Sequence, residues 1–322
     1  MGNLSSITSS ASSTEDAVTL ENISLFEKFI ELPDNLDAQV FSTLPLQDKS
    51  GLARTSHYYY GLFSQHIHAA KCLMFVAHGD QTAADMMLRR NPKLLLECAD
   101  VTDYSGRKFE KITAYEYAYW AKDTHMCRML EAHMDKATKA KMLLRIDAME
   151  MQGLTYEQHG VVVEHSTHFD FTPLIKALTN YVALNNFDIR SKKAWMYVGV
   201  AQRDLPVHVM NEYFHPNRSF HPIPAFNEEI LPRNLTFYNE ISDTTHEVFP
   251  LVVSSSGLGV DFALTRGSGR SVSFGGWGGE SCDLEALINL DEVRTADLAL
   301  SRENLKPSGP GHSLPGTILK IT

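Results

Sequence analysis

The residues best suited to chemistry lie in the second half of the chain. Three histidines and a glutamate fall in one segment: His208, Glu212, His215 and His221. Imidazole and carboxylate groups are common zinc ligands, but this spacing matches no zinc signature, because H-E-x-x-H is absent and no cysteine lies nearby. We therefore expect surface or hydrogen-bonded histidines here, and no metal site.

Cys282 would be a nucleophile if a histidine lay beside it, because an imidazole can take the proton of a thiol. The sequence identifies no such partner. The preceding glycine-rich run, residues 275–279, lacks the Lys and Ser/Thr of a phosphate-binding loop and predicts a tight turn. We expect no catalytic residue and no cofactor. An enzymatic C-terminal domain stays open as the alternative, with Cys282, Glu280 and His208 as the groups to inspect.

The composition is that of a globular protein with room for more than one core. The chain has 322 residues, of which 43% are hydrophobic and 21% charged. A formal net charge of −10 and the absence of Lys/Arg runs argue against a nucleic-acid partner. No apolar stretch is long enough to cross a bilayer. Four scattered cysteines without a C-x-x-C motif predict free thiols in a reducing compartment: Cys72, Cys98, Cys127 and Cys282.

The N-terminus carries a separate signal. Met1-Gly2-Asn3-Leu4-Ser5-Ser6 fits the pattern for N-myristoylation of Gly2. One acyl chain gives only marginal membrane binding, so we expect at most a weak membrane association. The alternative is that residues 1–24 are simply a disordered, Ser-rich leader.

Short amphipathic helices are predicted in residues 25–66. Apolar residues that recur every four positions share one face of the first helix: Leu36, Val40 and Leu44. Pro33 stands at the start of this helix, where its missing N–H costs nothing, and Pro45 stops it. Ser56 is a good N-cap for a third segment. Three such helices are too small to form a stable core alone, so their apolar faces need a partner.

This pattern resembles an F-box over residues 32–63, with the Leu-Pro opening and Leu44-Pro45-Leu46 as its most specific parts. The resemblance implies docking on the Skp1 adaptor of cullin-RING ubiquitin ligases, in a complex with Cullin-1. The side chains that it assigns to Skp1 are Leu32, Pro33, Leu36, Val40, Leu44, Pro45, Leu46 and Leu52. The alternative is a helical hairpin buried against its own domain, in a scaffold that involves no ubiquitin.

Residues 67–151 predict pairs of helices joined by tight turns. Thr113-Ala114-Tyr115-Glu116-Tyr117-Ala118 resembles the Thr-Pro-Leu-His-x-Ala signature of ankyrin repeats. Asp123-Thr124-His125 takes the place of the turn inside a repeat, and Gly79-Asp80 marks the same turn one repeat earlier. Their separation exceeds the ankyrin period of about 33 residues. The resemblance implies a degenerate ankyrin-like domain; the alternative is an irregular helical domain.

The excess length falls on Val101–Lys111, which we expect to project as a polar loop. Ankyrin modules bind proteins with the loops between their helix pairs. Four residues of this loop combine charge, aromatic rings and a guanidinium group, and are the candidate target-binding residues: Asp103, Tyr104, Arg107 and Phe109. The alternative is a solvated loop that only caps the repeat.

The rest of the chain has a mixed pattern. We interpret residues 152–168 as a linker, 169–305 as a mixed α+β C-terminal domain with antiparallel hairpins, and 306–322 as a flexible tail. Strands are predicted at 248–253, 260–264 and 271–274, with helices at 283–290 and 291–305. The predicted fold class is therefore α+β, with a mainly helical N-terminal half.

The combination of modules resembles type IV secreted effectors of Legionella- and Coxiella-type intracellular bacteria. Residues 100–118 and 201–213 carry this resemblance together with the F-box-like helices. It implies a bacterial effector delivered into the host cytosol, acting as a substrate adaptor that recruits an unidentified host protein to an SCF-type ubiquitin ligase. A C-terminal enzyme that modifies a host protein is the alternative.

Overall fold

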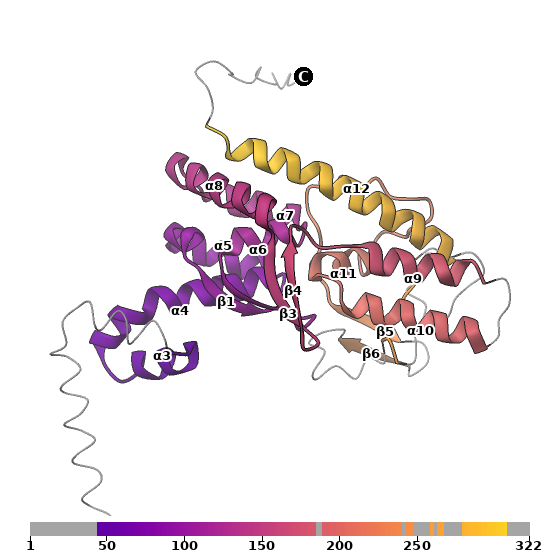
Figure 1. Cartoon of the computed structure of the whole chain (residues 1–322), viewed down its shortest axis with the longest axis horizontal. Helices are drawn as coiled ribbons and strands as arrows, with labels where there is room; N and C mark the ends of the chain where they lie inside the picture. The colour runs from indigo at the N-terminus through magenta and orange to yellow at the C-terminus, as the bar shows by residue number, and fades with distance from the viewer. Residues whose placement is uncertain are drawn as a thin grey trace, which may run out of the picture. The chain divides into compact units, whose positions relative to one another are not determined.

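The computed structural model describes residues 44–184, 189–239, 243–247, 258–260, 263–266 and 279–307 (Figure 1). Contacts divide the chain into two compact units, with the boundary between Ile67 and His68. Helices dominate, and the strands form two small antiparallel sheets. The prediction of an α+β fold is confirmed.

The first unit has a small core of its own. Helix α3 (Leu46–Ala53) and the first half of helix α4 (His57–Ala77) bury three residues together: Ala53, Tyr59 and Phe63. The rings of Tyr59 and Phe63 stack with their centroids 6.2 Å apart. The Ser56 hydroxyl accepts the backbone N–H of Tyr59, as expected of an N-cap.

The second unit begins with two helix–turn–helix arrangements. The turn that precedes α5 (Gln81–Arg90) and the turn between α6 (Ala114–Trp120) and α7 (Thr124–Glu131) share one design. A residue with positive φ, Gly79 or Lys122, is followed by an aspartate whose carboxylate caps the next helix. The caps are Asp80 to the Ala83 N–H at 2.9 Å and Asp123 to the Met126 N–H at 3.1 Å. The two turns therefore share one capping geometry, and the repeat itself stays a prediction.

The segment between the two helix pairs differs from the projecting loop that we expected. After the short helix η1 (Pro92–Leu96), it forms a hairpin of strands β1 (Ala99–Thr102) and β2 (Lys108–Ile112). Asp103, Arg107 and Phe109 are buried. The alternation of charged and apolar residues along β2 places Phe109 on the inner face of the sheet, where it packs against Tyr117 and Trp120.

Residues 152–168, expected to be a linker, also form a hairpin. Helix α8 (Lys136–Gln152) leads directly into β3 (Leu154–Gln158) and β4 (Val161–Ser166). β3 pairs with β2, so the sheet has the order β1-β2-β3-β4. The pairing of Phe109 with Tyr156 places aromatic rings side by side on the core face.

The remaining elements are mostly helical. They are α9 (Thr172–Val182), α10 (Ile189–Arg203), α11 (Val207–Tyr213), the hairpin β5 (Thr236–Asn239) and β6 (Thr244–Glu247), and α12 (Gly279–Leu305). The last helix is continuous where two were expected, because no glycine or proline interrupts it after Gly279. The predicted strands 248–253 and 271–274 lie outside the described residues, as does part of 260–264.

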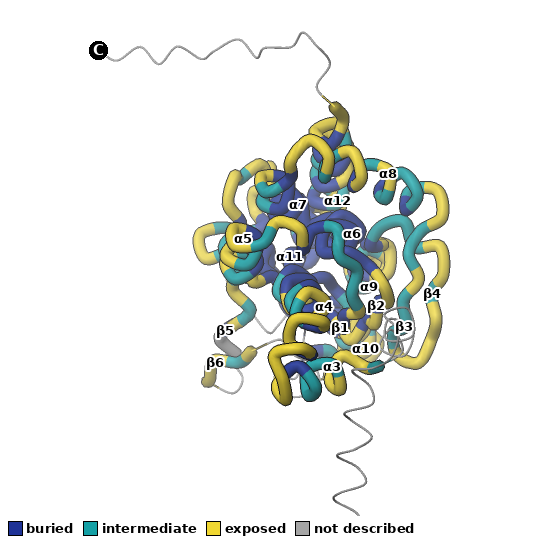
Figure 2. Tube along the Cα trace, turned by 90° about the vertical axis from the view of Figure 1, so that its left-hand side faces the viewer, coloured by how far each residue is buried: buried dark blue, intermediate teal, exposed yellow. Residues whose placement is uncertain are grey.

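One hydrophobic core joins most of the described elements of the second unit. It extends along the chain from Ala69 to Leu305. Every residue of α6 and α11 is buried, and Figure 2 shows both helices in the dark-blue interior. α12 packs against α7, α8 and α9 and runs along all three (Figure 1). The helix pairs near the start of the second unit and its C-terminal elements therefore pack into the same hydrophobic core.

The tip of the β1–β2 hairpin is held by a buried ion pair. The guanidinium of Arg107 lies 3.5 Å from the Asp103 carboxylate, donates to the carbonyl of Asp204, and sits over the rings of Trp120 and Phe169. Burial raises the pKa of Asp103, while Arg107 counters that rise. Arg107 therefore connects the hairpin to the segment after α10.

Arg107→Met should lower the free energy of unfolding by about 3–5 kcal/mol, because it leaves the buried Asp103 carboxylate without its cation. Urea unfolding followed by circular dichroism measures the loss. Lys108→Met is the matched control, because it removes an exposed ion pair with Glu157. The side chains of Lys108 and Glu157 are 59% and 45% accessible. The control should cost less than about 1 kcal/mol. Equal losses in the two variants would contradict the role given to Arg107.

Candidate functional site

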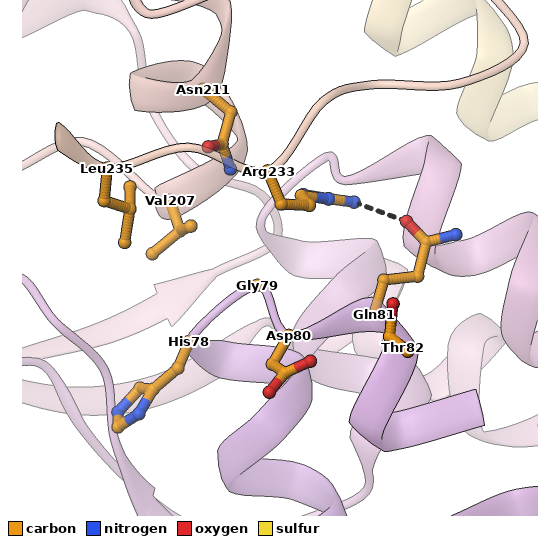
Figure 3. Close-up of a pocket in the computed structure, with 9 residues that line it drawn as sticks. All are labelled: His78, Gly79, Asp80, Gln81, Thr82, Val207, Asn211, Arg233 and Leu235. Carbon is orange, nitrogen blue, oxygen red and sulfur yellow. Dashed lines mark hydrogen bonds between the residues drawn. The ribbon is translucent and has the colours of Figure 1, made fainter. Parts of the chain in front are cut away.

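A pocket of about 310 Å³ lies between the turn before α5, helix α11 and the segment that leads into β5 (Figure 3). Its lining residues are His78, Gly79, Asp80, Gln81, Thr82, Val207, Asn211, Arg233 and Leu235. Three segments far apart in the sequence thus meet at one hollow. Its walls combine apolar side chains with amide, hydroxyl and guanidinium groups.

The floor of the pocket requires a glycine. Gly79 has φ of +76°, in the left-handed region that favours glycine. A Cβ atom there would lie 2.5 Å from Cγ1 of Val207 on α11. The turn before α5 can therefore approach α11 closely only because residue 79 has no side chain.

Arg233 supplies the guanidinium of the pocket and is fixed on both sides. Its two terminal nitrogens donate to the Asp123 carboxylate at 2.7 and 2.9 Å. One of them also donates to the Gln81 side-chain oxygen at 3.2 Å (Figure 3). Burial alone would raise the pKa of Asp123, but the Arg233 guanidinium holds it well below its usual range. The pair is therefore ionised and mutually neutralised at pH 7.

Asn211 supplies an unused hydrogen-bond donor. Its side-chain oxygen accepts the backbone N–H of Asn234 at 2.6 Å. Its amide nitrogen is buried and has no hydrogen-bond partner within the described part of the chain. In Figure 3 this nitrogen points toward the space between Val207 and Arg233. The Nε–H of Arg233 is likewise buried and unpartnered among the described residues.

Two neutral histidines lie close to this ion pair. Burial lowers the pKa of His125 to about 4 and that of His208 to about 3. The His125 ring contacts the Glu228 carbonyl at 2.8 Å, whereas neither ring nitrogen of His208 has a partner in the described segments. Beside them, Arg294 on α12 donates to the buried Glu212 carboxylate at 2.9 Å.

The structure does not gather the histidines that the sequence analysis considered as metal ligands. His208 is fully buried in α11, His215 accepts the backbone N–H of Asn217, and His221 is exposed. Across the described ranges, no group of three His, Cys, Asp or Glu side chains is placed to hold a metal ion. His208 is the exception to our expectation of surface or hydrogen-bonded histidines.

His221 has a different neighbour. Its Nδ1 atom lies 3.5 Å from the Sγ atom of Cys282, in the first turn of α12. This is the histidine partner that the sequence could not identify, because 61 residues separate the two positions. Cys282 is half-buried, like Cys98, whereas Cys72 and Cys127 are buried.

Other predicted site residues are distributed unevenly. Gly2, Leu32, Pro33, Leu36 and Val40 lie outside the described residues. Leu44 and Leu52 are half-buried against the small core, while Pro45 and Leu46 are exposed. Of the four candidate target-binding residues, only Tyr104 is partly accessible. Its ring stacks on that of His78 in the pocket, with the ring centroids 3.9 Å apart.

Among the residues that line the pocket, Gly79 and Asp80 were predicted only as a turn, and no other was predicted as a site residue. Asp123 was identified only as part of a turn, and its acidic type at a helix start was the available signal. Arg233 and Asn211 gave no signal, because their role depends on contacts with residues about 110 and 23 positions away.

Comparisons with known proteins show both a matching domain family and a related protein. Residues 173–305 match the domain family described as the CBUA0006 C-terminal domain. The uncharacterized protein CBUA0006 of Coxiella burnetii (strain RSA 493 / Nine Mile phase I) is 39% identical over 273 residues, which cover 76% of this chain and 77% of that protein. The family scan matched no F-box or ankyrin family. No solved structure matches the chain. None of the described helices is long and apolar enough to span a membrane.

Low pH should destabilise the second unit, over a pH range set by the pKa values of His125 and His208. In the unfolded chain both titrate near pH 6.5, whereas in the folded chain they stay neutral down to about pH 4 and 3. Below pH 6.5 the unfolded state therefore binds protons that the folded state does not. The free energy of unfolding consequently decreases as the pH is lowered. We expect a loss of about 1–2 kcal/mol per pH unit between pH 6 and 4, measured by urea unfolding.

His208→Phe is the informative variant, because it replaces one of these histidines by a ring of similar size that does not titrate. The slope of stability against pH should fall by roughly half, with no comparable loss of stability at pH 7. An unchanged slope would show that other groups cause the acid sensitivity.

Proposed function

This chain belongs to the CBUA0006 family, and from that premise we propose that it is a bacterial effector that works as a non-catalytic adaptor in the host cytosol. Residues 32–63, the F-box-like helices, bind host Skp1 and through it the Cullin-1 complex. The unit that begins at His68 selects the host protein to be ubiquitinated. Acylation of Gly2 would add a weak membrane association.

The observation that carries this proposal is the separate core of the first unit. Among the residues of this unit that the structure describes, 44–67, only Ala53, Tyr59 and Phe63 are buried. Large apolar side chains of the same short helices remain exposed: Leu46 at 45%, Tyr58 at 45%, Tyr60 at 53% and Leu62 at 39%. Short helices with so few buried residues and this much exposed apolar surface are typical of a helical unit that completes its packing on a partner.

Leu46 supports the assignment to Skp1 in particular. It follows Pro45 at the start of α3, in the Leu-Pro-Leu part of the F-box-like sequence. Both residues are exposed, so the apolar edge that the resemblance assigns to Skp1 is accessible at this point. The exposure of Pro45 and Leu46 favours docking on a partner over the alternative, burial of this segment in its own domain.

Purified host Skp1 bound to the N-terminal part of Cullin-1 tests the proposal by titration calorimetry. The wild-type chain should bind, and Leu32→Ala with Pro33→Ala should weaken binding at least about tenfold, since apolar anchors dominate such interfaces. Leu144→Ala, which removes a side chain 71% exposed on α8, is the control and should bind like the wild type. Failure of the wild type to bind Skp1, or equal binding of the double variant, would refute the adaptor function.

A second candidate function is favoured by the contact between Cys282 and His221. A thiol with an imidazole 3.5 Å away, in the first turn of a long helix, has the geometry of a nucleophile with its base. In that case the C-terminal region would be an enzyme that forms a covalent intermediate on Cys282, and the F-box-like helices would only localise it.

Alkylation by iodoacetamide tests this candidate. The thiol sulfur displaces iodide and its proton passes to His221, so a working pair should make Cys282 react faster than in the His221→Ala variant. We expect about a tenfold difference at pH 7, with each site quantified by peptide mass spectrometry. Cys98, half-buried beside Arg145, is the internal reference and should not change. Equal rates for Cys282 in both proteins would remove the enzymatic candidate.

A further inference from the structure

We propose that the pocket between α5 and α11 is a peptide-recognition site, which takes a neutral backbone amide of an extended segment together with one small or medium apolar side chain. This inference deepens the proposed adaptor function, because it gives the chemistry by which the second unit recognises its target. It concerns only how the second unit recognises its target and is independent of the binding of Skp1.

The pocket offers hydrogen-bond donors that nothing else in the described chain uses. The Asn211 amide nitrogen and the Arg233 Nε–H are both buried and unpartnered among the described residues, and both residues line the pocket. A buried polar group without a partner costs about 1–3 kcal/mol, so each of these donors favours a ligand with an acceptor. Carbonyl oxygens of a ligand are suitable acceptors for these donors.

The charge balance of the lining favours a neutral acceptor over an anion. The guanidinium of Arg233 is neutralised by its two hydrogen bonds to Asp123. Asp80 adds a negative charge, and burial lowers the pKa of His78, which keeps this ring neutral at pH 7. Among the described lining residues, no positive charge is left for a phosphate or carboxylate.

The N-terminus of α5 does not reverse this balance. Helix starts attract anions through their free N–H groups. Here the Asp80 carboxylate already accepts the Ala83 N–H at 2.9 Å, and the Gln81 N–H donates to the Gly79 carbonyl at 2.9 Å. The N–H groups of Gln81 and Ala83 at the start of α5 are therefore already bonded to acceptors of the protein itself.

The apolar part of the lining gives the site its second feature. Val207 and Leu235 form one wall, and the backbone of Gly79 lies against Val207. A volume of about 310 Å³ is at the lower end of the range for ligand sites, so it suits a single residue of a chain. The stacked rings of His78 and Tyr104 extend the apolar surface beyond it.

Three probes separate this proposal from its rivals: N-acetyl-leucine methylamide, sodium acetate and inorganic phosphate. Side-chain N–H resonances of Asn211 and Arg233 in two-dimensional ¹⁵N spectra of the full chain report binding at this pocket. We expect saturable shifts with the methylamide in the millimolar range, and none with acetate or phosphate at equal concentration. Shifts with phosphate or acetate but not with the methylamide would overturn the proposal, as would no binding of any probe.

Two variants locate the site. Asn211→Asp keeps the oxygen that accepts the Asn234 N–H but loses the donor, and should weaken methylamide binding at least about tenfold. Leu235→Ala shortens a half-buried wall residue and should weaken it about threefold, which keeps the test valid if the first variant does not fold. Unchanged affinity in a folded variant would contradict the site. Skp1 binding measured on the same proteins should stay at the wild-type level, so failure of this inference is distinct from failure of the adaptor function.

Discussion

The ion pair between Asp123 and Arg233 is the interaction on which the candidate site depends. One carboxylate caps α7 and accepts two hydrogen bonds from a guanidinium that lies 110 positions later in the chain. It thereby fixes the turn between α6 and α7 to the segment before β5. Because both partners are largely buried, the loss of either would leave an uncompensated charge in the interior. Because Asp123 already neutralises the charge of Arg233, this arginine can offer a ligand a hydrogen bond but no net positive charge.

The surroundings of this pair are unusually polar for a protein interior. Glu212 lies between Arg294 and Arg218, and His208 is enclosed with no hydrogen bond to the described residues. Such groups stabilise a fold less than well-packed apolar side chains do, but each tolerates few alternative arrangements of its neighbours. They thus favour one way of packing α12 against α11, whose residues line the pocket.

Local signals in the sequence were sufficient for most helices. The Ser56 cap and the turns at Gly79-Asp80 and Asp123-Thr124-His125 depend on a few neighbouring residues and could be read directly. The β1–β2 hairpin was missed for a physical reason. Asp103 and Arg107 look like surface residues, and only their mutual neutralisation inside a ring of aromatic side chains makes burial possible. The pocket and the Cys282–His221 contact depend on pairings between distant segments, for which one sequence contains no local pattern.

The position of α12 has a consequence for how the protein is made. This helix is the last described element of the chain, yet it packs on α7 and α8, which are synthesised more than a hundred residues earlier. A ribosome-bound chain therefore exposes the apolar faces of those helices until translation has passed Leu305. The piece that matches the family model, residues 173–305, contains α12 and α9 but lacks α7 and α8, so on its own it would leave part of the packing surface of α12 uncovered.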